Sequence, residues 1–219
     1  MMANAFPSHS GTMPTRPDRA RRAAHGAAAP VARALALPEP AEAWERLGFA
    51  PGGPIGDVAV ALGAPALELA VSGLEAERPD GLPLVATDAG PAGHARHPNG
   101  ATVVDHVVAL TDDMARTLAA LGDAGLELRR MREPPEAPAS QAFFNLRTLV
   151  LEVVEVKGDG PALWGLTVVV GDLDALGPLV EAPRSAVQPG RRIATVRKEV
   201  GLRTALAFMT PRPHRSRPS

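Results

Sequence analysis

The sequence of 219 residues contains no cysteine, and aromatic residues make up only 3% of it. The absence of cysteine excludes disulfides, thiolate zinc sites and cysteine nucleophiles, so a bound metal would need His, Glu, Asp or Gln ligands. It also favours a reducing compartment, and we therefore expect a cytoplasmic protein. The small number of aromatic side chains leaves little surface for stacking against a ligand.

The sequence also lacks a long hydrophobic run and a dominant charge. No run of about 18 apolar residues is present, which excludes a transmembrane helix, and no continuous apolar segment follows the N-terminal arginines, so a secretory signal is not expected. The net charge is −1, but residues 1–30 and 211–219 together hold seven arginines and one aspartate, or +6, which leaves −7 for the rest. This acidic body argues against nucleic acid as a partner.

The first part of the chain predicts a basic tail and a small ordered unit. Residues 1–30 are rich in Pro, Ser, Arg and Ala without periodicity, which predicts disorder, as does the Pro-rich segment 211–219. Residues 31–37 read as a strand and residues 39–47 as a helix that ends at Gly48.

Two apolar segments follow this helix. Residues 57–62 and 65–71 flank Gly63, which can adopt the positive φ of a tight turn, so the pair predicts a hairpin. The density of Gly, Pro, Asp and His from residue 74 to residue 100 indicates a long connection.

A clearer unit begins after this connection. Residues 103–110 form an apolar strand, and Thr111-Asp112-Asp113 can cap the first turn of a helix on which Met114, Leu118 and Leu121 recur at helical spacing. A strand at residues 126–132 and a hairpin at residues 141–156 complete the order strand, helix, strand, strand, strand.

The same order then starts again. Residues 163–170 predict a strand, residues 171–176 the start of a helix, and residues 191–200 and 204–209 a last hairpin. Leu146-Arg147-Thr148 also recurs as Leu202-Arg203-Thr204, which indicates an internal repeat.

At these residues the chain resembles the vicinal oxygen chelate superfamily, the group of glyoxalases, bleomycin-resistance proteins and extradiol dioxygenases. The resemblance implies an α+β fold in which two strand–helix–three-strand modules pair around a shared cavity. Residues 101–210 would form this paired-module domain, and residues 31–100 an abbreviated extra N-terminal module and its connection. In metal-dependent members of the superfamily, the first and last strands of each module supply one ligand apiece.

Carrying this pattern onto the repeat identifies ligands in one module only. His106 and Glu152 occupy the two ligand positions of the module that begins at residue 101. Counting by the same steps from Asp172 and Thr204 gives Gly165 and Phe208 in the next module, and neither side chain can bind a metal. The matching position in the N-terminal module is Glu68.

We therefore consider two interpretations of these residues. In one, His106, Glu152 and Glu68 bind a divalent metal such as Zn, Ni, Mn or Fe(II), and Glu152 also acts as a catalytic base. In the other, His106 is neutral and hydrogen-bonded within the strand layer, and Glu152 is a partly solvated cavity residue or pairs with an arginine. Either interpretation places a polar cavity at Glu152, lined by residues of the neighbouring strands, namely Val108, Val150, Val154, Trp164, Thr167 and Phe208.

The resemblance implies a small organic molecule as ligand and leaves three functional classes open. An enzyme of lyase, isomerase or dioxygenase type would chelate its substrate through the metal. A metal-free protein of bleomycin-resistance type would sequester a ligand by shape and aromatic contacts, and such proteins usually form homodimers. The third class is a degenerate module without catalysis. His94 and His97, in the Gly/Pro-rich connection, are expected to be solvated rather than metal-bound.

Overall fold

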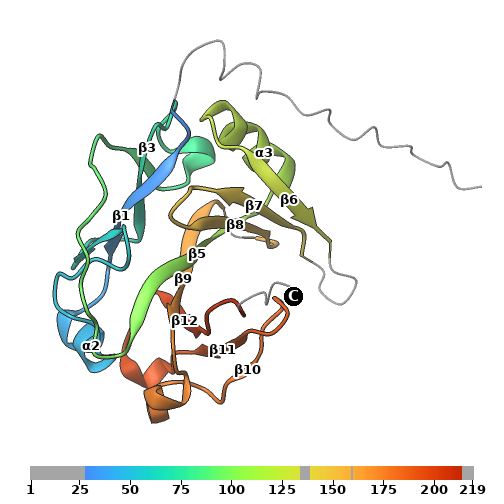
Figure 1. Cartoon of the computed structure of the whole chain (residues 1–219). Helices are drawn as coiled ribbons and strands as arrows, with labels where there is room; N and C mark the ends of the chain where they lie inside the picture. The colour runs from blue at the N-terminus through green and yellow to red at the C-terminus, as the bar shows by residue number, and fades with distance from the viewer. Residues whose placement is uncertain (1–27, 134–138, 159, 214–219) are drawn as a thin grey trace, which may run out of the picture.

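The protein is described by a computed structural model that covers residues 28–133, 139–158 and 160–213 (Figure 1). Most of the two segments expected to be disordered therefore lies outside the described residues. The strands are β1 Val31–Leu37, β2 Ala59–Leu62, β3 Glu68–Ser72, β4 Leu84–Ala86, β5 Ala101–Thr111, β6 Leu128–Arg132, β7 Gln141–Asn145, β8 Val150–Glu155, β9 Ala162–Val170, β10 Arg184–Ser185, β11 Arg192–Thr195 and β12 Ala205–Met209. The helices are α2 Ala41–Arg46 and α3 Met114–Asp123, with 3₁₀ turns η1 Pro79–Gly81, η2 Asp174–Leu179 and η3 Lys198–Val200.

Eight of the strands form one curved sheet in the order β10-β11-β12-β9-β5-β8-β7-β6. Strands β5 and β9 lie side by side and antiparallel at its centre, while β8 runs parallel to β5 and β12 runs parallel to β9. The two halves thus have the same internal strand order, and the first of them is a complete strand–helix–three-strand module. Figure 1 shows the two halves bending toward each other, so the sheet has a concave and a convex face. This arrangement confirms the predicted α+β fold of paired modules.

The helix of the first module begins as its sequence predicts. Asp113 is the N-cap residue, and its Oδ1 accepts a hydrogen bond of 2.9 Å from the Arg116 backbone N–H. The second module lacks such a helix. Residues 174–179 form a 3₁₀ turn instead, interrupted at Gly177, whose φ is +55°, and at the following Pro178, which has no backbone N–H.

The N-terminal unit forms a separate four-stranded sheet in the order β2-β1-β3-β4. Its elements follow one another as in a module, but its strands are ordered differently in space. The predicted hairpin is wrong, because β2 and β3 do not pair with each other: β2 is parallel to one edge of β1 and β3 is antiparallel to the other. Gly63 does adopt a positive φ of +77°, but the chain turns there to cross over the end of β1.

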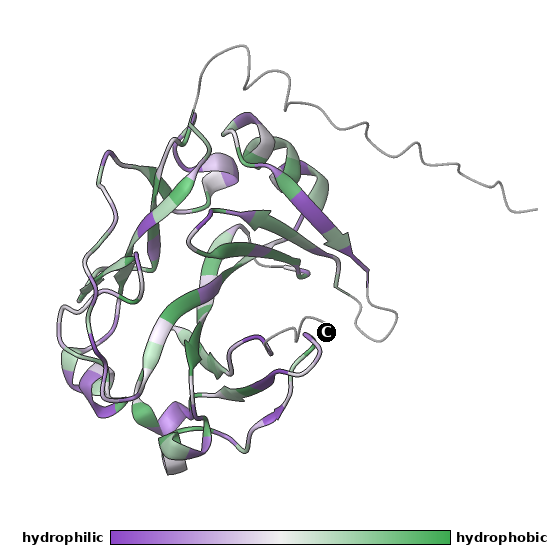
Figure 2. Ribbon diagram, viewed as in Figure 1, coloured by the Kyte–Doolittle hydropathy of each residue, from purple (hydrophilic) through white to green (hydrophobic). Residues whose placement is uncertain are grey.

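This unit covers the convex face of the eight-stranded sheet. The Phe49 ring stacks on Phe208 of β12, with 5.7 Å between the ring centroids. The buried Glu39 carboxylate accepts hydrogen bonds of 2.7 and 2.8 Å from the backbone N–H groups of Arg203 and Thr204. The main core therefore lies between the two sheets, and the N-terminal unit does not cover the concave face. In Figure 2 hydrophobic residues predominate on β7 and β8, while β6 carries more hydrophilic ones.

No helix of the described residues is long and apolar enough to cross a membrane.

Candidate functional site

The site begins at an irregularity in β5. The register between β5 and β9 shifts between Val104 and His106, so Asp105 is an extra residue without a partner on β9. Such a bulge disturbs the alternation by which neighbouring side chains point to opposite faces. As a result, Asp105 and His106 each line a cavity on the same side of the sheet.

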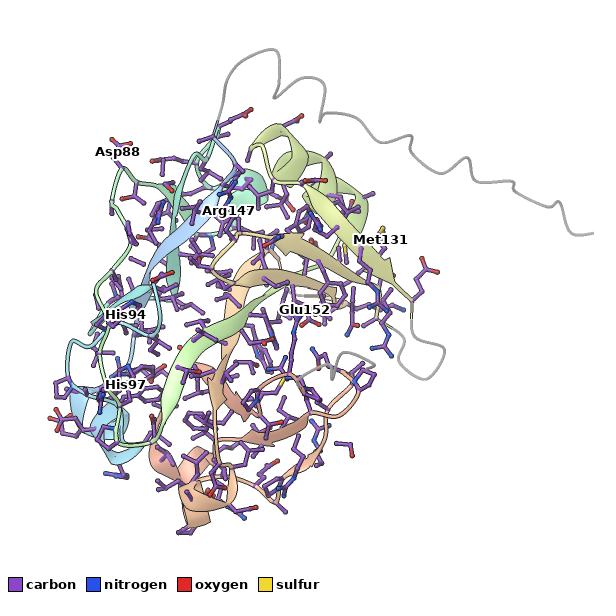
Figure 3. The ribbon with its side chains drawn as sticks, in the orientation of Figure 1. Asp88, His94, His97, Met131, Arg147 and Glu152 are labelled. Carbon is purple, nitrogen blue, oxygen red and sulfur yellow. The ribbon has the colours of Figure 1, made fainter. Side chains whose placement is uncertain are left out.

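Glu152 lies beside His106 on the concave face. It is on β8, the strand parallel to β5, and its Oε2 is 3.6 Å from His106 Nε2. The same ring nitrogen is 3.0 Å from Thr167 Oγ1 on β9. Figure 3 shows Glu152 on the inner side of the curved sheet. Three adjacent strands thus bring a carboxyl, an imidazole and a hydroxyl together.

A cavity of about 180 Å³ contains this group, and we call it the inner cavity. Every strand of the eight-stranded sheet except β9 contributes a residue to its wall, and the turn after β10 contributes further residues. Its lining residues are His106, Arg132, Gln141, Phe143, Glu152, Arg184, Ala186, Val187, Gln188, Ile193 and Met209.

Asp105 fixes the orientation of His106. Asp105 Oδ2 lies 3.0 Å from His106 Nδ1, and Asp105 Oδ1 accepts a hydrogen bond of 2.7 Å from Arg191 Nη1. Burial alone would raise the pKa of Asp105, but the hydrogen bonds from His106 and Arg191 outweigh it, and the pKa is lowered. Asp105 is therefore a carboxylate that accepts a hydrogen bond from the Nδ1–H of His106, and Nε2 of His106 faces Thr167 and Glu152.

The buried Arg191 holds Asp105 in place. Only 1% of its side chain is exposed, and its Nε donates to the backbone oxygen of Thr210 over 2.7 Å. Its Nη2 has no hydrogen-bond partner among the described residues. A buried cation must be compensated, and Asp105 compensates Arg191.

The net pKa shift at Glu152 is in the opposite direction. Burial raises the pKa of the Glu152 carboxyl and outweighs the lowering effect of the nearby charges of His106 and Arg132. Two neighbouring carboxyls thus have pKa values shifted in opposite directions, the pattern by which enzymes separate a fixed charge from a proton carrier.

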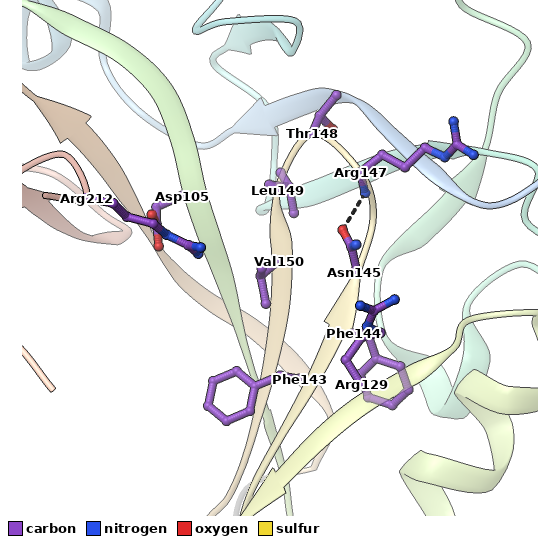
Figure 4. Close-up of a pocket in the computed structure, with 10 residues that line it drawn as sticks. All are labelled: Asp105, Arg129, Phe143, Phe144, Asn145, Arg147, Thr148, Leu149, Val150 and Arg212. Carbon is purple, nitrogen blue, oxygen red and sulfur yellow. Dashed lines mark hydrogen bonds between the residues drawn. The ribbon is translucent and has the colours of Figure 1, made fainter. Parts of the chain in front are cut away.

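A second cavity of about 410 Å³ lies beside the turn between β7 and β8, and we call it the hairpin cavity. Figure 4 shows Asp105 and Arg212 on one side of this turn and Arg129 and Arg147 on the other. Arg147 adopts a positive φ of +63°, and its backbone N–H donates to Asn145 Oδ1. Phe143 lines both cavities, which therefore adjoin each other along the concave face.

Several of the side chains expected in the cavity share the face of Glu152. Cross-strand partners point to the same side of a sheet, and Glu152 is the partner of Val108, while His106 is the partner of both Val150 and Thr167. Val150 lines the hairpin cavity. Val108 and Val154 are half-buried and line neither cavity.

The expectation that Phe208 lines the cavity is wrong. Phe208 is the partner of Val168, which in turn is the partner of Val104, and these residues face the convex side. The Phe208 side chain is completely buried against the N-terminal unit. Its neighbour Met209 lines the inner cavity instead. Trp164 is 55% exposed and lines neither cavity.

Glu68 is not brought to the site. It lies on β3 of the other sheet, where its Oε2 accepts a hydrogen bond of 3.0 Å from Arg78 Nη2. His106 and Glu152 therefore supply two of the about three protein donors of a catalytic metal site. The described residues contain no group of three or more His, Asp or Glu side chains able to hold a metal ion, so this donor set does not fit the expected divalent metal.

The two histidines of the connection differ from each other. His94 is exposed, but His97 is buried: its Nδ1 accepts from the Ala50 backbone N–H, and its Nε2 donates to the Pro54 oxygen over 2.9 Å. Both ring nitrogens of His97 are thus occupied by the backbone. Figure 3 shows both histidines on the side of the molecule away from Glu152.

Sequence reasoning missed Asp105, Arg191 and Arg184. The Asp105-His106 doublet inside an apolar strand was a usable signal, because two consecutive polar residues break the alternation and suggest a bulge. The two arginines belong to a segment around a short strand and had no such signal.

No family model matches the sequence, and no curated protein matches it. Among solved structures, methylmalonyl-CoA epimerase from Mycobacterium tuberculosis matches with 17% identity and a TM-score of 0.44, over 52% of this chain and 91% of that one. A hypothetical protein from Bacillus halodurans matches with 14% identity and a TM-score of 0.43, over 52% and 97%.

A Streptomyces coelicolor methylmalonyl-CoA epimerase in complex with 2-nitronate-propionyl-CoA matches with 18% identity and a TM-score of 0.41, over 50% of this chain and 97% of that one. Similarity at this level implies no common ligand. The strand order of the chain itself shows two modules with the same internal order on either side of the central pair β5 and β9. This is the paired-module arrangement that the resemblance to the vicinal oxygen chelate superfamily implied.

Proposed function

We propose that the chain binds a small organic molecule in the inner cavity and that Glu152 transfers a proton from a carbon atom next to a carbonyl group of that molecule. The observation that carries the proposal is the position of Glu152, a largely buried carboxyl 3.6 Å from an imidazole that is itself oriented by Asp105. A general base needs both reach and a pKa near the working pH. Burial shifts the pKa of Glu152 in this direction, because it raises it above its ordinary value.

The proposed step uses only side chains of the site. The Glu152 carboxylate takes the proton, and the electron pair of the broken C–H bond moves to the carbonyl oxygen to form an enolate. The protonated Glu152 then returns a proton to the same carbon. Donors and positive charges around the cavity stabilise the negative oxygen, because they are held in place before the reaction begins.

Deuterium exchange tests this step without knowledge of the natural substrate. Acetone, hydroxyacetone and pyruvate are incubated in D₂O with the protein, and loss of the proton signals next to the carbonyl is followed by NMR. We expect exchange of at least one compound with the wild type, and exchange about 100-fold slower with Glu152→Gln, the low end of the usual contribution of a general base.

The matched control is Glu181→Gln, which changes an exposed glutamate outside both cavities. It should exchange at the wild-type rate. Equal rates for wild type and Glu152→Gln would remove Glu152 from the reaction, provided that both proteins unfold at a similar temperature.

A second candidate is a binding protein that sequesters its ligand without chemistry. It is favoured by the half-buried Phe143, the phenylalanine that lines both cavities. In this case ligands would raise the unfolding temperature of the wild type, none would undergo exchange, and Phe143→Ala would abolish the temperature shift.

A further inference from the structure

Two arginines reach the inner cavity from opposite edges of the sheet. Arg132 is the last residue of β6 and Arg184 the first of β10, and these are the two end strands of the eight. Because the sheet curves, both side chains line the same cavity as Glu152. Arg184 is exposed and Arg132 is half-buried, so we call the part of the cavity beside them its rim.

The charges of the cavity favour an anion. Arg132, Arg184 and His106 line it together with a single carboxyl, Glu152. The nearby charge of Asp105 is already compensated by Arg191 at 2.7 Å. Arg184 forms no ion pair with any residue that the structure describes, whereas Arg192 on the adjacent strand is paired with Asp174 at 3.1 Å. A guanidinium without an ion pair among the described residues is a ready partner for a carboxylate, which it can bind through two parallel hydrogen bonds.

Size and apolar lining narrow the class of anion. A volume of about 180 Å³ lies below the roughly 300–1,000 Å³ of pockets for drug-sized ligands, which favours a compact molecule. Phe143, Ile193 and Met209 offer apolar surface beside the arginines, and this surface suits a short carbon chain but contributes nothing to an inorganic anion.

From this arrangement we propose that the inner cavity recognises a compact organic acid whose carboxylate is bound by Arg184. The proposal rests on the proposed function and extends it, because it identifies the chemical group at the end of the ligand that does not react at Glu152. With the carboxylate at the rim, the carbon chain points inward to the apolar wall and to Glu152.

Pyruvate is a suitable probe, since it is a monocarboxylate of the right size, and pyruvamide is its neutral counterpart of nearly equal shape. Binding of each to the full chain is measured by isothermal titration calorimetry at low salt. We expect pyruvate to bind wild type at least about tenfold more tightly than pyruvamide. Arg184→Gln should lose at least this factor for pyruvate and none for pyruvamide. The control Arg192→Gln removes an equal charge from the neighbouring strand and should bind both probes as wild type does.

Three outcomes would overturn the proposal. They are equal affinity for pyruvate and pyruvamide, unchanged pyruvate affinity in Arg184→Gln, and the absence of pyruvate binding to wild type at millimolar concentration. Inorganic phosphate is titrated in parallel. If it binds as tightly as pyruvate with the same dependence on Arg184, the site takes anions in general and the assignment to organic acids fails.

A further variant separates this proposal from the proposed function. Glu152→Gln should retain pyruvate binding, or strengthen it through the loss of a negative charge, while deuterium exchange is lost. Pyruvate binding in wild type without any exchange would support the carboxylate site and contradict the proton transfer. Exchange of acetone without pyruvate binding would do the reverse.

Discussion

On the concave face, the central strands of the first module carry ionisable side chains where those of the second module carry none. Asp105, His106 and Glu152 lie on β5 and β8 and line the two cavities. On β9 and β12, the corresponding parallel pair, the side of the sheet that faces the cavity holds Thr167 and Met209. The strand order of the first module is repeated in the second, but its ionisable side chains are not.

The second module contributes in another way, from its outer strands. Arg191 precedes β11 and reaches across to Asp105, and Arg184 on β10 lines the inner cavity. The first module thus supplies the carboxyls, and the second adds Arg191 and Arg184, which orient or complement them. This division explains why no symmetrical ligand set can form at the centre. At Gly165 of β9 an added Cβ would lie only 2.5 Å from the Ala205 backbone oxygen, so the strands approach too closely for a side chain there.

The largest effect on stability should come from a residue of the second module that is outside the site. Phe208→Ala removes a completely buried ring that stacks on Phe49, and we expect a loss of about 4 kcal/mol in the free energy of unfolding. Urea denaturation measures it. The control is Phe143→Ala, which truncates a half-buried ring of the first module and should cost much less. Equal losses in the free energy of unfolding would contradict the assignment of the convex face to the core and of the concave face to the cavities.

The error at Phe208 shows how far sequence reasoning reaches in this chain. The order of the elements was predictable, since apolar alternation defines β5, β8 and β9, and Asp113 is a recognisable N-cap residue. It was harder to predict toward which face of the sheet each side chain points. Counting from Thr204 placed Phe208 opposite Glu152, but a slip of one residue moves a side chain to the other face of a strand, and Met209 is the residue that lines the cavity.

Pairing between distant strands was harder still. Gly63 correctly indicated a turn, yet nothing local reveals that β1 lies between β2 and β3. The same difficulty hid the distance of Glu68 from the site. Likewise the contact of Arg191 with Asp105 spans 86 residues of sequence, and only the assembled sheet brings the two together.

The second prediction concerns the support that one module gives the other. Arg191→Met leaves the Asp105 carboxylate buried without its cation, and we expect a loss of about 3 kcal/mol in the free energy of unfolding. Urea denaturation at neutral pH provides the measurement. If the variant is as stable as wild type, the first module holds its site alone and the division of labour proposed here is wrong.

The double variant Arg191→Met/Asp105→Leu is the control for this prediction. It removes both charges and fills much of their space, so it should recover a large part of the stability lost by Arg191→Met alone. A double variant that is less stable by the sum of the two single losses would show that the residues do not interact.

The smallest effect should appear as a pH dependence at Glu152. Because burial raises the pKa of Glu152 in the folded protein, the folded state retains this proton at pH values where the unfolded chain has released it. The stability of wild type therefore falls as pH rises from the unfolded value near 4.5 through the folded pKa, and stays lowered above it. Glu152→Gln cannot titrate, so its free energy of unfolding, relative to wild type, should increase over this interval by about 1 kcal/mol, in the ordinary range for one substitution.

Asp105 has its pKa lowered, so its contribution to stability is lost at lower pH instead. This contribution is common to both proteins and cancels in the difference. Urea denaturation of the two proteins between pH 4 and pH 8 gives this difference directly. A difference that is constant with pH would place Glu152 in water, and the first module would then hold a fixed charge at Asp105 but no proton carrier beside it.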